Sequence, residues 1–120
     1  MKLNLFRTRP KMAPHKDGIL RLSIDESRLS AANVESLRKQ YFPQVVGQST
    51  LVLRLNQLTF IDSSGLGFLV GLRKNMLPPQ KVVLEGISDP TLLDLFKLTR
   101  MDQIFLLCND SKEAELLLSR

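Results

Sequence analysis

Cysteine, histidine and tryptophan are scarce in this chain of 120 residues, which has one Cys, one His and no Trp. A lone Cys108 rules out an internal disulfide framework, and one His with one Cys offers too few ligands for an ordinary zinc site. No apolar run approaches the roughly 20 residues of a membrane span. The apolar stretch after Met1 is interrupted by Arg7, too soon for a signal peptide. We therefore expect a cytoplasmic protein with a reduced thiol, no bound metal and no cofactor.

Acidic residues are absent from the first 16 positions, although these positions carry five basic residues: Lys2, Arg7, Arg9, Lys11 and Lys16. The rest of the chain is balanced, so the net charge of +5 belongs to this N-terminal segment. A uniformly basic face for nucleic acid is therefore not supported. We expect residues 1–17 to form a basic arm or an edge strand around 3–8, and residues 18–120 to form one domain. The arm could touch nucleic acid or an anionic membrane, but such segments are more often solvated.

Hydrophobic periodicity predicts alternating strands and helices along the domain. Strands are expected at 19–24, 50–55, 81–85 and 104–108, with an apolar strand end at 58–61, and helices at 31–41, from 62 to the Pro78-Pro79 stop, from Pro90, and from Ser111. Ser30, Asp89 and Asp110 are the expected N-caps, and Pro43 is expected to close the first helix. The order predicts an α/β domain with a mixed, mostly parallel sheet of four to five strands and about four helices.

The most unusual local feature is the run Phe60-Ile-Asp-Ser-Ser-Gly-Leu-Gly67 at a strand-to-helix junction. Such junctions lie at the carboxyl ends of parallel strands, where ligands and partners usually bind. Asp62 or Ser63 can cap the helix, which leaves the Ser64 hydroxyl in the first turn facing solvent. A phosphate on Ser64 would suit the positive end of the helix dipole but would hinder a partner docked over the same turn. The alternative is a purely structural turn, with glycines for tight helix packing.

Catalytic interpretations of this motif are weak. The sequence lacks the G-x-S-x-G elbow of hydrolases, a third glycine for a dinucleotide fingerprint, and a phosphate-binding loop. The single histidine, His15, lies in the basic arm, so an enzyme with Ser64 as nucleophile would lack a base. Asp25-Glu26 is better explained as a solvated turn than as an acid/base pair. Phe68 and Leu72 are good core residues, although they could instead surface on their helix as a docking patch.

In the stretch Leu58-Thr-Phe-Ile-Asp-Ser-Ser-Gly-Leu-Gly67 the sequence resembles the STAS domain, specifically the stand-alone anti-sigma factor antagonists of bacterial partner-switching systems. The resemblance extends more loosely from Gly18 to about Leu118. It implies a binding module that is not an enzyme: unphosphorylated, it binds an anti-sigma serine kinase and frees the sigma factor. Phosphorylation of Ser64 inactivates it, and a metal-dependent serine phosphatase reverses the mark.

The resemblance also implies helices on one side of the sheet and an extra N-terminal edge strand. One departure is Ser27-Arg-Leu-Ser30, where the family commonly has Gly-x-Leu-Asp. The docking surface expected from motif and resemblance comprises Asp62, Ser63, Ser64, Gly65, Phe68 and Leu72, on a chain that is monomeric when free and contacts no nucleic acid or membrane directly. A partner-switching module with a non-sigma output and a STAS subunit of a transporter remain the alternatives.

Overall fold

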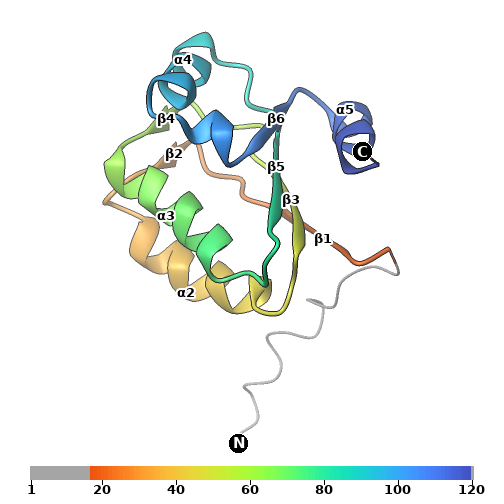
Figure 1. Cartoon of the computed structure of the whole chain (residues 1–120). Coiled ribbons are helices and arrows are strands. Elements are labelled where there is room, and N and C mark those ends of the chain that lie inside the picture. The colour runs from red at the N-terminus through yellow and green to blue at the C-terminus, as the bar shows by residue number, and fades with distance from the viewer. Residues whose placement is uncertain (1–16, 120) are drawn as a thin grey trace, which may run out of the picture.

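The computed structural model describes residues 17–119, so the expected edge strand at 3–8 lies outside the described residues. Strands and helices alternate along the chain as expected (Figure 1). The strands are β1 Ile19–Ser23, β2 Arg28–Leu29, β3 Thr50–Arg54, β4 Phe60–Ile61, β5 Lys81–Glu85 and β6 Leu106–Cys108. The helices are α2 Val34–Val45, α3 Ser63–Lys74, α4 Pro90–Leu98 and α5 Ser111–Leu118, with a short 3-10 helix, η2, at Met101–Gln103.

The strands form a four-stranded sheet in the order β1-β3-β5-β6 and a two-stranded sheet of β2 and β4. All strand pairs within residues 17–119 are parallel. The carboxyl ends of β1, β3 and β5 therefore point the same way, and the small β2-β4 sheet leads directly into α3. This confirms the α/β class and the predominantly parallel pairing.

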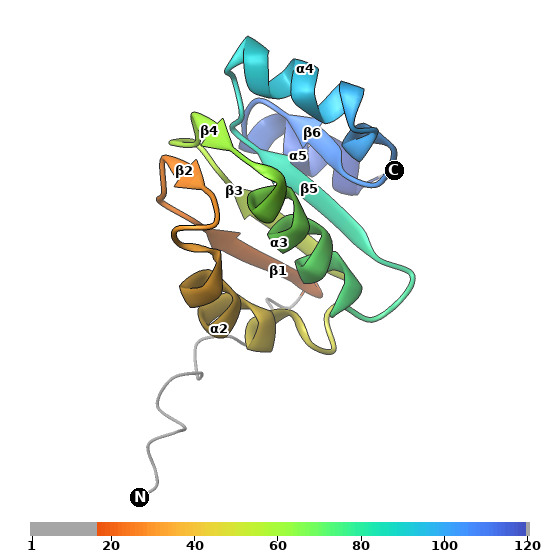
Figure 2. The same ribbon diagram turned by 90° about the vertical axis from the view of Figure 1, so that its left-hand side faces the viewer.

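Helices cover both faces of the large sheet (Figure 1). Figure 2 shows α2 and α3 side by side on one face, with α5 behind the sheet. The main core fills the first face, whereas the second face has a small cluster of Val52, Val83, Cys108 and Ala114. The expectation of helices on one side is therefore wrong. The near-continuous apolar strands β3 and β5 explain why, because side chains alternate between faces and both faces need a cover.

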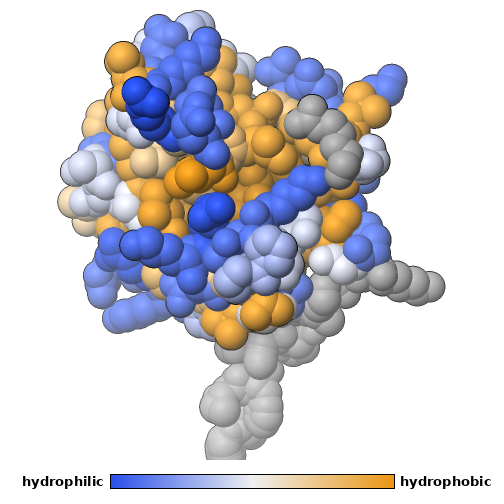
Figure 3. Space-filling model, viewed as in Figure 1, coloured by the Kyte–Doolittle hydropathy of each residue, from blue (hydrophilic) through white to orange (hydrophobic). Residues whose placement is uncertain are grey.

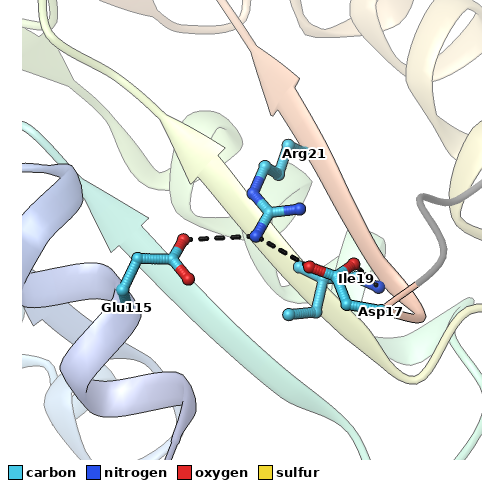
Figure 4. A network of polar contacts seen from close by, with 4 residues as sticks. All are labelled: Asp17, Ile19, Arg21 and Glu115. Carbon is cyan, nitrogen blue, oxygen red and sulfur yellow. Dashed lines mark hydrogen bonds and ion pairs between the residues drawn. The ribbon is translucent and has the colours of Figure 1, made fainter.

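On the second face, ion pairs also connect the edge strand β1 to α5. The Arg21 guanidinium lies between Asp17, 3.1 Å away, and Glu115 of α5, 3.2 Å away (Figure 4). These side chains are partly exposed, so each pair adds little stability. In the view of Figure 3, apolar surface gathers between the positions of α4 and α5.

Two predicted helix boundaries are wrong at the first helix. Helix α2 starts at Val34 with Asn33 in the cap position, because the Ser30 carbonyl instead closes a turn by accepting from the Asn33 N–H at 3.0 Å. Pro43 lies inside α2 rather than after it. Buried Val45 anchors the last turn beyond the proline, and the Gln44 side chain donates to the Gln40 carbonyl at 2.9 Å. The burial of Val45 thus stabilises a helical turn beyond Pro43, although proline usually ends a helix.

No helix in the described part of the chain has the length and apolarity needed to cross a membrane.

Candidate functional site

The candidate site is the corner where β4 becomes α3. Strand β4 pairs with β2, matching Arg28 with Phe60 and Leu29 with Ile61. Two segments that are about thirty residues apart in the sequence are therefore joined just before the motif serines. The corner lies beside the turn that leads from β2 into α2 (Figure 2).

Asp62, one of the two expected caps, is the N-cap of α3. One carboxylate oxygen accepts from the Gly65 N–H at 2.9 Å, and the other accepts from the Ala31 N–H at 3.1 Å. These backbone hydrogen bonds, that from Gly65 first and that from Ala31 second, lower the pKa of Asp62 below its ordinary value. Asp62 is therefore a carboxylate at neutral pH, fixed at the positive end of a helix.

The two motif serines differ in exposure. Ser63 is exposed and Ser64 is half-buried. Within residues 17–119 the Ser64 hydroxyl makes no hydrogen bond to another residue. Ser64 shares a side of α3 with Gly71, seven residues later, which faces the Phe42 ring of α2. The Ser64 side chain therefore lies on the flank of α3 that is turned toward α2.

The two motif glycines differ in how much space surrounds them. A Cβ at Gly65 would collide with the Leu29 carbonyl oxygen and would lie 2.6 Å from the Ile61 side chain. A Cβ at Gly67 would meet nothing within 4 Å. Tight packing thus explains Gly65, as the structural interpretation of the turn proposed, but it does not explain Gly67. Because Gly67 is exposed and has no side chain, no side chain projects from α3 at this position beside the serines.

Residues 10–114 of the chain match the STAS domain family. The chain belongs to the STAS domain family. Its fold is also similar to the crystal structure of a proposed anti-sigma factor antagonist from Thermotoga maritima, with a TM-score of 0.72 and 21% sequence identity. The match covers 87% of this chain and 90% of the Thermotoga chain. The resemblance read from residues 58–67 is therefore confirmed at the level of the family and its fold.

The prediction that Phe68 and Leu72 of this STAS domain belong to a docking surface is wrong. Phe68 is fully buried and Leu72 is 1% exposed. The Phe68 ring stacks on Phe42 of α2 with 5.8 Å between ring centroids, so it joins α2 and α3. The exposed side of α3 is instead formed by Ser63, Gly67 and Lys74.

Three features of the corner were not found from the sequence. The Arg28 guanidinium lies 4.0 Å from the centre of the Phe60 ring, which remains 38% exposed. An apolar groove of about 340 Å³ separates β4 from α4, lined by Phe60, Ile61, Leu92, Leu95 and Leu98 among others. The Ala31 N–H reaches Asp62 across the corner. The first and the third depend on the β2-β4 pairing, and a two-residue strand has no periodicity that the sequence could reveal. The groove depends on how α4 packs beside β4.

Ser30 occupies the position at which the family commonly has an aspartate, so this chain has no acidic residue at that position. Ser30 is buried, its N–H donates to Asn33 Oδ1 at 3.0 Å, and its hydroxyl accepts from the Ala32 N–H at 3.2 Å. The nearby acids in sequence, Asp25 and Glu26, are both exposed. Within residues 17–119, Asp62 is thus the carboxylate that accepts backbone N–H groups from both segments of this corner.

Proposed function

We propose that this STAS domain is an anti-sigma factor antagonist regulated by phosphorylation of Ser64. In its unphosphorylated form it binds an anti-sigma serine kinase and so releases the sigma factor. The kinase inactivates it by modifying Ser64, and a metal-dependent serine phosphatase restores it. The observation that supports this most directly is the Ser64 hydroxyl, which is partly accessible in the first turn of α3 and makes no internal hydrogen bond within residues 17–119.

The surroundings of Ser64 favour a phosphate that disturbs docking more than folding. The phosphate adds about −1.5 to −2 charges at the N-terminus of α3, where the helix dipole favours negative charge. It also lies two residues from the ionised Asp62, so a partner covering the turn would have to desolvate two neighbouring anions. The docking surface consists of Asp62, Ser63 and Ser64, with Gly65 setting the position of the turn and Gly67 leaving access along α3.

Phosphorylation is tested by incubating the protein with the cognate kinase and ATP and locating the phosphate by mass spectrometry. We expect labelling at Ser64 that Ser64→Ala abolishes. Ser63→Ala is the matched control, because it removes the neighbouring hydroxyl and should leave labelling in place. Labelling that persists in Ser64→Ala would contradict the proposal.

Docking is tested with Ser64→Asp. We expect kinase affinity to fall by about thirtyfold or more, because charge mismatch at a desolvated contact costs about 2 kcal/mol or more. The melting temperature should stay within about 2 °C. Ser111→Asp is the control, since it adds the same charge to the first turn of another Asp-capped helix and should leave affinity unchanged. Unfolding of Ser64→Asp would support a purely structural turn.

The output is tested by a pull-down from the source cell with and without phosphatase treatment. Recovery of a kinase bound to a sigma factor, and only by the dephosphorylated protein, is the expected result. Stable recovery of a permease or a transporter ATPase, insensitive to phosphatase, would favour the transporter alternative.

A further inference from the structure

The Asp62 carboxylate connects two segments of the chain, which sets it apart from the other aspartate caps. Asp89 accepts from the Thr91 N–H of its own helix at 2.8 Å, and Asp110 accepts from the Glu113 N–H of its own helix at 2.9 Å. Asp62 makes the same local bond and also accepts from Ala31 at 3.1 Å, 31 residues away. We call the hydrogen bond between the Asp62 carboxylate and the Ala31 N–H the latch.

The latch provides the acceptor for the one backbone N–H of the turn at residues 30–33 that has no acceptor inside that turn. The turn is also tied to the preceding segment, because the Asn33 side chain donates to the Arg28 carbonyl at 2.8 Å and to the Glu26 carboxylate at 3.4 Å. The Asn33 N–H donates to the Ser30 carbonyl, and the Ala32 N–H donates to the Ser30 hydroxyl. The Ser30 N–H donates to Asn33 Oδ1. The Ala31 N–H is the backbone donor of this turn whose acceptor is Asp62, the N-cap of α3. The turn thus takes its position relative to α3 partly from a single charged acceptor.

Ser64 is well placed to disturb this acceptor. It follows Asp62 by two residues, and its side chain lies on the flank of α3 that faces α2, the side on which the 30–33 turn leads into α2. A phosphate there repels the carboxylate and offers its own oxygens to nearby N–H groups. The bond from Gly65 is local and measures 2.9 Å, whereas the latch measures 3.1 Å and joins segments 31 residues apart, so we expect the latch to break first when the carboxylate moves.

We propose that phosphorylation of Ser64 breaks the latch, so that the 30–33 turn changes its hydrogen bonding together with the start of α3. This inference rests on the proposed function only for the choice of Ser64 as the modified residue. It extends the switch from one helix turn to a second, exposed turn that a docked partner meets beside it.

The latch is tested by following backbone amide resonances by NMR in the unmodified protein and in protein with phosphoserine encoded genetically at position 64. In the unmodified protein, acidification should move the Ala31 and Gly65 amide resonances with one shared midpoint, because both donate to one carboxylate. In the phosphoprotein, Gly65 should keep this response and Ala31 should lose it. A shared response that persists in the phosphoprotein, or that is missing in the unmodified protein, would overturn the inference.

Hydrogen exchange gives a second measurement at neutral pH. Exchange of the Ala31 amide should quicken by about tenfold or more in the phosphoprotein, which corresponds to losing a hydrogen bond to a charged group. Phosphoserine encoded at Ser111 is the control and should leave the rate unchanged. Because neither measurement uses a kinase, they can fail while kinase labelling of Ser64 succeeds, and the reverse.

A pair of substitutions at Ala31 tests the latch without any phosphate. Ala31 is the second residue of the 30–33 turn, the position at which such turns favour proline, so Ala31→Pro is the substitution chosen to remove the N–H. It should move the acid midpoint of the Gly65 amide upward, since Asp62 loses one donor. Ala31→Ser keeps the N–H and should leave the midpoint in place. Equal midpoints in the two variants would show that the latch does not form.

Discussion

The starts of α3 and α5 carry the same local signal and play different parts in the fold. Each helix has an aspartate N-cap that accepts from the third residue of its helix at 2.9 Å. At α5 the cap is completed within the same segment, because Glu113 accepts from the Asn109 N–H at 2.7 Å. At α3 the cap reaches across to Ala31. A capping motif therefore predicts a helix start, but the tertiary neighbours decide whether that start is coupled to anything else.

The two corners also differ in the chemistry that they leave available. Ser64 at the α3 corner is partly accessible. Cys108, which ends the strand before α5, is buried, and burial first and nearby Glu85 second raise the pKa of its thiol to about 11. A thiol with that pKa is almost fully protonated at neutral pH and is a poor nucleophile. The thiol beside α5 is thus closed to modification, but Ser111 in the first turn of α5 is exposed, so the α3 corner differs in the contact of its cap with Ala31 rather than in offering an accessible serine.

Helices α3 and α5 should differ most in their response to the removal of one apolar side chain from each. Phe68→Ala should lower the free energy of unfolding by about 4 kcal/mol, because it empties a fully buried site and ends the stacking on Phe42. Leu116→Ala on α5 should change it by less than about 0.5 kcal/mol, since Leu116 is 64% exposed. Urea denaturation measures both. A small effect at Phe68 would restore it as a docking residue and contradict its place in the core.

Within α3, the two motif glycines should respond to alanine substitution in opposite directions. Gly65→Ala should destabilise the protein by about 3 kcal/mol, because the new methyl group collides with the Leu29 carbonyl, which is backbone and cannot move aside cheaply. Gly67→Ala should stabilise it by about 0.5 to 1 kcal/mol, because the site is open and alanine is the better helix former. Similar unfolding midpoints for the two variants would contradict the packing at Gly65.

Local chemistry allowed most of the elements to be predicted from the sequence. The aspartate caps of α3, α4 and α5 and the apolar strands β3 and β5 were all visible in short stretches. The errors come from contacts distant in sequence. Pro43 sits within a helix because Val45 is buried beyond it, and Phe68 is internal because Phe42 meets it. The β2 strand is too short to show a pattern, and with it the coupling between Asp62 and Ala31 was missed.

The acid dependence of stability separates Asp62 from an ordinary surface carboxylate. Hydrogen bonds from Gly65 and Ala31 hold its pKa in the folded protein below the unfolded value. Its contribution is therefore complete above the unfolded value, near pH 4, and is lost as the pH falls through the lower folded pKa. Asp62→Asn keeps a capping oxygen but presents no second carboxylate oxygen to Ala31. The difference in melting temperature between the wild type and Asp62→Asn should accordingly be constant from pH 7 to about 5 and shrink below about pH 4. A difference that persists unchanged to pH 2 would mean that the lost contact does not depend on the charge of Asp62.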